Sequence, residues 1–213
     1  MLTDLKKAAL VAGTAMGIRV LWDLAETIWT AVAPGAGIRG GSAAILVGMQ
    51  LIYVPLPLVF LLLYKTGIAL PVSRSGRYLA MAAALIEAVV VAASGLDRLR
   101  ADTRLISGPL YLLSGLAFLF LLIALSRPAS VPLDVDARRS NLLKAAAQVA
   151  MFAGGVAVFM SIGGVLFEVW VRSGGLPSVH FPNVTTARIL QTGLAGLPWL
   201  IAPFIVRSGL STL

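Results

Sequence analysis

Three ionisable residues, Arg19, Asp23 and Glu26, interrupt an apolar segment that is otherwise long enough to cross a bilayer. In a helix, which turns by about 100° per residue, these residues and Thr30 fall within an arc of about 60°, so they form one polar stripe on an apolar rod. A charge at bilayer depth costs about 2.5–3.5 kcal/mol even on an insertion scale. The stripe is therefore expected to face protein or a water-filled cavity and not lipid.

A fourth ionisable residue, Glu87, lies near the middle of another apolar segment, with no basic residue within one helical turn. Arg19 is the one cation at comparable depth, so Glu87 is expected either to meet Arg19 across helices or to take up a proton. Asp23, four residues after Arg19, is placed to form an ion pair with it inside the same helix. The sequence leaves both pairings open.

These groups form the candidate ligand- or ion-binding site: Arg19, Asp23, Glu26, Glu87 and Gln50. Arg19 would anchor an anion, the carboxylates would bind protons or cations, and Gln50 would help to line a polar vestibule. In the alternative interpretation, the same charges only lock helices together. No catalytic residue is assigned, because the chain has no Gly-x-Ser-x-Gly elbow, no His-Glu-x-x-His and no phosphate-binding glycine loop.

The scarcity of cysteine and histidine limits the kinds of metal or cofactor site that the chain can form. The chain has no cysteine and a single histidine, His180, which excludes disulfides, thiolate metal ligands and haem held by two histidines. No metal and no cofactor is expected.

The composition indicates a polytopic integral membrane protein. Of the 213 residues, 59% are hydrophobic and only 12% are charged, which is more apolar surface than a soluble domain of this size can bury. No polar run is long enough for an extramembrane domain, so residues 1–213 form a single membrane domain. The net charge of +8 lies mainly in short connections, where membrane topology and lipid headgroups explain it better than nucleic acid does.

Apolar segments separated by glycine, proline and charge predict an all-α bundle of six transmembrane helices. The predicted spans are residues 7–32, 42–64, 77–95, 105–126, 142–171 and 186–206. Proline is expected to interrupt two of them near their centres: Pro55 and Pro57 in the second, and Pro198 and Pro203 in the sixth. The first and third spans are expected to be adjacent, so that their charges share an interior.

The distribution of lysine and arginine predicts an orientation in the cell membrane. Ten of these residues lie on the side of the N-terminus and six on the other side, which favours both termini in the cytoplasm. Each even-numbered span follows an arginine (Arg39, Arg104 or Arg188) and ends at a basic residue, a pattern compatible with three helical hairpins in series.

The leading functional hypothesis is a small multi-pass membrane protein with an internal polar cavity that binds or conducts a small solute, ion or proton. The alternative is a non-catalytic subunit or assembly factor that joins partner subunits in a larger membrane complex. A membrane enzyme that uses Asp23 and Glu87 as acid–base groups is a third hypothesis, although the absence of catalytic motifs argues against it. The lipid bilayer is the one partner common to all three.

Overall fold

The computed structural model describes residues 2–32, 47–48, 50–68, 70–100, 107–127, 137–173 and 194–211. Within these ranges the chain is all-helical, as the sequence predicts. Its six helices are α1 (Leu2–Val32), α3 (Pro55–Thr66), α4 (Arg74–Arg100), α5 (Ser107–Leu125), α6 (Ala137–Arg172) and α8 (Leu197–Ser211).

Four of these helices are long and apolar enough to cross a membrane, in the segments Asp4–Thr30, Arg74–Ala93, Gly108–Leu125 and Arg139–Phe167. They correspond to the first, third, fourth and fifth predicted spans. The second and sixth predicted spans are described only in part, and the described part of each contains a shorter apolar helix, α3 or α8. With 12 and 15 residues, these two are shorter than the roughly 20 residues that cross a bilayer.

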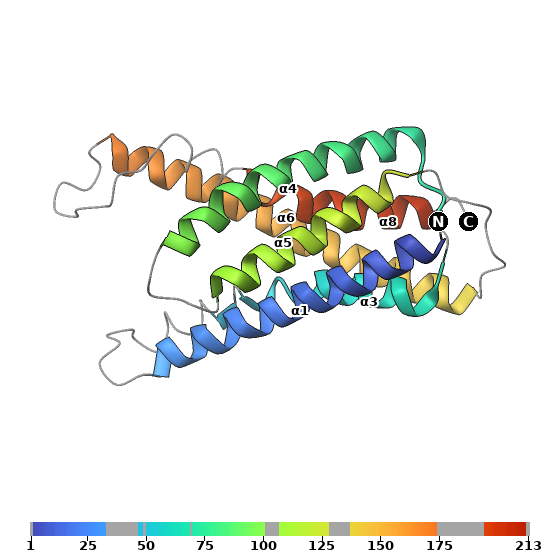
Figure 1. Ribbon diagram of the computed structural model, residues 1–213, viewed down its shortest axis with the longest axis horizontal. Coiled ribbons are helices and arrows are strands. Elements are labelled where there is room, and N and C mark those ends of the chain that lie inside the picture. Colours follow the sequence, from blue (N-terminus) through green and yellow to red (C-terminus); the bar gives the residue numbers. More distant parts are fainter. Residues whose placement is uncertain are drawn as a thin grey trace.

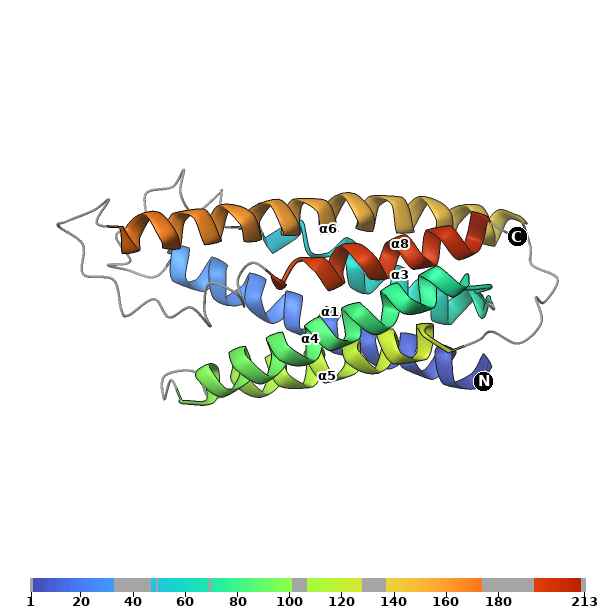
Figure 2. The same cartoon turned by 90° about the horizontal axis from the view of Figure 1, so that it is seen from above.

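The helices form a closed ring in which each packs against two neighbours, in the order α1, α5, α4, α8, α6, α3 and back to α1. Helices α3 and α8 also touch each other across the ring. Figures 1 and 2 show that α1 begins and α8 ends at the same end of the bundle, which we call the basic end because Lys6, Lys65, Arg127 and Arg207 lie there.

One sequence-based expectation about neighbours is wrong. Helices α1 and α4, the first and third predicted spans, make few contacts at most, because α5 lies between them in the ring and packs against both. Three pairs of successive helices pack together: α1 with α3, α4 with α5, and α6 with α8.

The apolar core fills the half of the bundle next to the basic end. It joins the first half of α1, the start of α4, the end of α5 and the start of α6 to the two short helices. The rings of Phe60 and Phe118, both fully buried, lie 5.7 Å apart at its centre. A Cβ atom on Gly13 would lie 2.9 Å from Leu61 Cγ, so this glycine lets α3 approach α1 closely.

In α1 and α6, the close packing ends before the helix does. Beyond Asp23 in α1 and beyond Ala157 in α6, the described side chains are half-buried or exposed. On α6 this change lies at the start of α8, where a Cβ atom on Gly196 would lie 2.7 Å from the backbone nitrogen of Val158.

Proline explains how two helices can begin inside the bundle. The first four N–H groups of a helix have no partner within it, and leaving them unpaired in an interior is costly. Pro55 and Pro57 remove two of these donors from α3, and the N–H of Leu56 donates to the carbonyl of Tyr53 at 3.4 Å. Residues 52–54 form the turn that precedes α3. The predicted interruption of the second span is therefore confirmed.

The described part of the sixth predicted span begins in a similar way. Ala195 and Gly196 form a turn, and Pro198 occupies the second position of α8. Pro203, which was also expected to break this span, lies inside α8, and the helix continues through it to Ser211.

Candidate functional site

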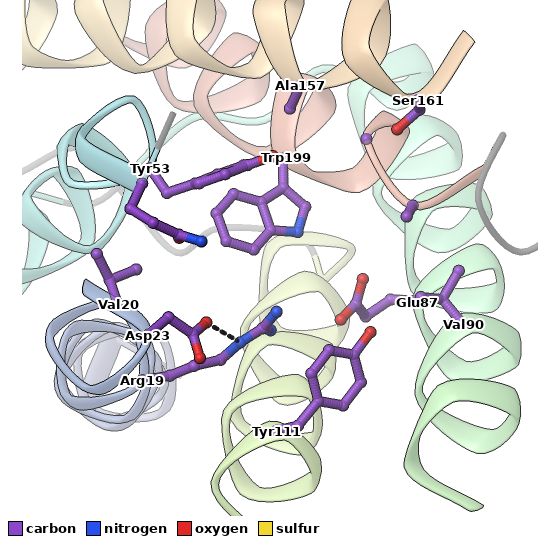
Figure 3. Close-up of a pocket in the computed structure, with 13 residues that line it drawn as sticks. Arg19, Val20, Asp23, Tyr53, Glu87, Val90, Tyr111, Ala157, Ser161 and Trp199 are labelled. Atoms are coloured by element: carbon purple, nitrogen blue, oxygen red, sulfur yellow. Dashed lines mark ion pairs between the residues drawn. The ribbon is translucent and has the colours of Figure 1, made fainter. Parts of the chain in front are cut away.

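A cavity of about 210 Å³ lies where the two short helices begin. Residues from all parts of the ring line it, namely Arg19, Val20, Asp23, Gln50, Tyr53, Glu87, Val90, Tyr111, Ala157, Ser161, Ala195, Gly196 and Trp199 (Figure 3). It is large enough for several water molecules or a small solute. It is smaller than the roughly 300–1,000 Å³ of pockets that enclose drug-sized ligands.

Arg19 is held in the cavity by contacts on several sides. Its Nε atom lies 3.5 Å from Asp23 Oδ2, and an Nη1 N–H donates to the Ser114 hydroxyl at 3.5 Å. The guanidinium carbon lies 4.2 Å from the ring centre of Tyr111 and 5.8 Å from that of Trp199, within the range of cation–π attraction. The closest charged partner of Arg19 is therefore Asp23, in its own helix.

Glu87 lies on the other side of the guanidinium, which Figure 3 shows between the two carboxylates. Its side chain is only 4% exposed, and its Oε2 atom has no hydrogen-bond partner in the described part of the chain. The direct ion pair between Glu87 and Arg19, one of the two predicted pairings, does not form. A buried carboxylate oxygen without a partner is costly unless a proton, water or ligand satisfies it.

A glycine on α5 makes room for this carboxylate. A Cβ atom on Gly115 would lie 2.2 Å from Val91 Cγ2 and 3.4 Å from Glu87 Oε1. No real side chain accommodates the first of these distances, so the absence of a side chain at position 115 allows α4 to press Val91 and Glu87 against α5.

Four of the five predicted site residues line the cavity together: Arg19, Asp23, Gln50 and Glu87. Glu26, one turn beyond Asp23, is half-buried and is not among the lining residues. Thr30, the last member of the predicted stripe, is exposed, and its hydroxyl donates to the backbone carbonyl of Glu26 at 2.9 Å. The polar stripe of α1 therefore faces the cavity only along its first half. His180, Arg39, Arg104 and Arg188 lie outside the described residues.

Three aromatic residues of the cavity were not predicted from the sequence: Tyr53, Tyr111 and Trp199. The rings of Tyr53 and Trp199 meet edge to face at 5.0 Å. Both residues stand beside an interrupting proline, Tyr53 two residues before Pro55 and Trp199 directly after Pro198, so the proline positions carried a usable signal. The aromatic residues that flank the stripe in sequence, Trp22 and Trp29, are exposed on the outside.

The start of α8 turns the positive end of its helix dipole toward one side of the cavity. Ala195, Gly196 and Trp199 belong to this start, whereas Gln50 lies before the turn that precedes α3 and Tyr53 lies within that turn. The N-terminus of a helix carries the equivalent of about half a positive charge. Interrupted membrane helices use such ends to bind anionic groups.

The start of α8 is held tightly against α6. A Cβ atom on Gly196 would lie 2.7 Å from the backbone nitrogen of Val158, and one on Gly154 would lie 2.6 Å from the carbonyl oxygen of Trp199. These two glycines allow backbone-to-backbone contact, which fixes Trp199 in the cavity wall.

The described residues contain no group of three or more histidine, aspartate or glutamate side chains that could hold a metal ion. The lining of the cavity presents a guanidinium, two carboxylates, an amide, hydroxyls and aromatic faces to a ligand. In comparison with known proteins, no family model, no curated protein and no solved structure matches this chain.

Proposed function

We propose that this chain is a multi-pass protein of the cell membrane that binds a small polar solute or ion in its internal cavity and conducts it across the bilayer. The observation that carries this proposal is the cavity itself, in which Arg19, Asp23, Gln50 and Glu87 converge where two interrupted helices begin. Ionisable groups inside apolar helices are costly, and they typically mark solute, ion or proton pathways.

The outer surface supports a membrane location. Large apolar side chains cover the outside of the long helices, among them Leu21, Leu85, Phe152 and Phe159, each at least 65% exposed. Soluble monomers rarely expose apolar surface on this scale. The exposed lysines and arginines of the basic end fit a cytoplasmic orientation of both termini.

In this proposal the second and sixth spans cross the bilayer as interrupted segments, which makes six spans in all. The pairwise packing of α1 with α3, α4 with α5 and α6 with α8 supports three helical hairpins in series.

One observation favours binding over a purely structural role for the carboxylates. Arg19 joins α1 to α5 and α8 through Ser114, Tyr111 and Trp199, but its ion pair with Asp23 lies within one helix. Glu87 forms no ion pair with Arg19, and its Oε2 atom has no hydrogen-bond partner within the described residues, so neither carboxylate joins two helices through an ion pair with Arg19.

The absence of cysteine allows a direct test by single-cysteine variants. Ser161→Cys places a thiol in the cavity, whereas Phe159→Cys places one at nearly the same depth on the outside of α6. Ala150→Cys, on the same face as Ser161 but three turns away, places one in the apolar core. Each variant is treated in reconstituted vesicles with a charged methanethiosulfonate, which modifies only thiols in contact with water.

We expect modification of Ser161→Cys but not of Phe159→Cys or Ala150→Cys, while a membrane-permeant maleimide modifies Phe159→Cys. Full reaction of all three after denaturation confirms that each thiol is intact. An unreactive Ser161→Cys in the folded protein would exclude a hydrated cavity. Equal reaction of Phe159→Cys with the charged reagent would exclude a lipid-facing surface.

A further inference from the structure

We infer that the ligand of this cavity is a small zwitterion, a solute that carries a cationic and an anionic group on a short chain. This inference rests on the proposed function and names the class of solute that the site would take. It follows from the unequal placement of charge around the cavity.

The negative pole of the cavity is Glu87. Its side chain is 96% buried, its Oε2 atom lacks a hydrogen-bond partner within the described residues, and it lines the cavity. No ion pair joins Arg19 to Glu87, since the ion pair of Arg19 is with Asp23. An ammonium group of a ligand would supply both the missing positive charge and the missing donor.

The positive pole is formed by Arg19 and the start of α8. A guanidinium has five N–H donors, and Asp23 and Ser114 engage two of them, so donors remain for an anionic group. Helix α8 adds the positive end of its dipole from the side of the cavity that Gly196 and Trp199 line. A carboxylate or sulfonate is the group that such a pole prefers.

The two poles together decide between a zwitterion and a simple ion. A simple cation would satisfy Glu87 but leave the remaining donors of Arg19 unused, and a simple anion would satisfy Arg19 but leave Glu87 Oε2 without a donor. A zwitterion satisfies both poles.

The size and walls of the cavity fit a small solute of this class. Its volume is about 210 Å³, and the rings of Tyr53, Tyr111 and Trp199 form part of its wall. Aromatic faces attract ammonium groups, including methylated ones. The expected ligand is therefore an amino acid or a betaine of a few carbon atoms.

The test compares whole zwitterions with their halves on the purified full chain in detergent. The zwitterionic probes are glycine, β-alanine, glycine betaine and taurine, and the half-molecules are acetate, methylammonium and tetramethylammonium. We expect at least one zwitterion to raise the thermal midpoint by about 5 °C or more at a hundredfold excess over its Kd. The same zwitterion should slow the modification of Ser161→Cys about tenfold, and each half-molecule should do neither.

Variants of Glu87 identify the pole that holds the ammonium group. Glu87→Gln should weaken binding of the zwitterion at least tenfold, and Glu87→Asp should restore part of the affinity. Asp4→Asn, which removes a carboxylate near the start of α1 and far from the cavity, should leave the affinity unchanged. Unchanged affinity in Glu87→Gln would overturn the assignment of the negative pole.

The outcomes separate this inference from the proposed function. If the charged reagent modifies Ser161→Cys but none of the zwitterions binds, the cavity stands and the inference is wrong. If acetate or tetramethylammonium binds as tightly as any zwitterion, the ligand is a simple ion and the inference is again wrong. If the reagent does not modify Ser161→Cys, both proposals fail.

Discussion

The Nε atom of Arg19 lies 3.5 Å from the Oδ2 atom of Asp23, one turn later in the same helix, so the ion pair crosses no helix interface. The pair lets α1 carry two ionisable groups into the interior at a lower cost than either alone would impose. Among the described residues, the second carboxylate of the cavity, Glu87, forms no ion pair.

Removing the two members of the pair should have unequal effects. Arg19→Ala leaves Asp23 and Glu87 in one cavity without a cation, so we expect a loss of about 2–4 kcal/mol in the free energy of unfolding. Asp23→Ala should cost less, because the guanidinium keeps its contacts with Ser114, Tyr111 and Trp199. Denaturant unfolding of the single and double variants in detergent measures both losses. Purely additive losses in the double variant would show that the pair has no energetic coupling.

Glu87→Gln should leave the stability of the free protein unchanged or raise it by about 1 kcal/mol. The amide has the shape of the carboxylate but removes a buried group that carries an unsatisfied oxygen. If Glu87 held two helices together through a buried ion pair, the same substitution would lower the free energy of unfolding by about 3–5 kcal/mol. The thermal midpoint of the ligand-free variant, beside that of the wild-type chain, distinguishes the two roles.

Gly115→Ala should destabilise the contact of α4 with α5 by about 1–3 kcal/mol, because its Cβ atom would overlap Val91, which is buried. Shortening the opposing side chain in the double variant Gly115→Ala/Val91→Ala should recover part of this loss. Gly155→Ala on α6 is the matched control, since its Cβ atom would meet nothing within 4 Å. The better helix propensity of alanine should make that control neutral or slightly stabilising. Equal effects of the two alanine substitutions would contradict the close packing at Gly115.

Gly196→Ala should damage the cavity wall, since its Cβ atom would lie 2.7 Å from a backbone atom of α6, which cannot rotate away as a side chain can. We expect a loss near the upper end of the roughly 1–3 kcal/mol typical of overpacking. The displaced start of α8 should also shift the emission of Trp199, measured in a variant whose other three tryptophans are replaced by phenylalanine. Gly163→Ala, with nothing within 4 Å of its Cβ atom, is the control and should leave both quantities unchanged.

Much of the architecture follows from hydropathy and charge spacing. An apolar run longer than about 18 residues has few options other than a helix, so four long helices were predictable. The convergence of Arg19, Asp23, Gln50 and Glu87 was predictable too, because the cost of an ionisable group in an apolar surrounding drives such groups inward. Glu26 is not among the residues that line the cavity, because helical periodicity gives a side chain its direction but does not say where along the helix the cavity ends.

The order of helices around the ring was beyond reach of the sequence. Whether α1 meets α4 or α5 depends on which surfaces fit best, and that in turn depends on local features such as the missing side chain of Gly115. The aromatic wall was missed for a related reason. Tyr53 and Trp199 line the cavity because two helices begin in the interior, each with a proline in its first two positions. The positions of Tyr53 and Trp199 in the hydrophobic pattern alone do not distinguish these two residues from ordinary packing residues.

The loosely packed ends of α1 and α6 have a consequence for the motions of the bundle. Local unfolding requires least free energy where few apolar contacts are broken, so amide protons beyond Asp23 in α1 and beyond Ala157 in α6 should exchange with solvent deuterium faster than those of α3 or the end of α5. If the cavity takes a solute as proposed, fraying of these two helix ends would open its route, while the fully buried residues of α3 and α5 keep the rest of the molecule folded.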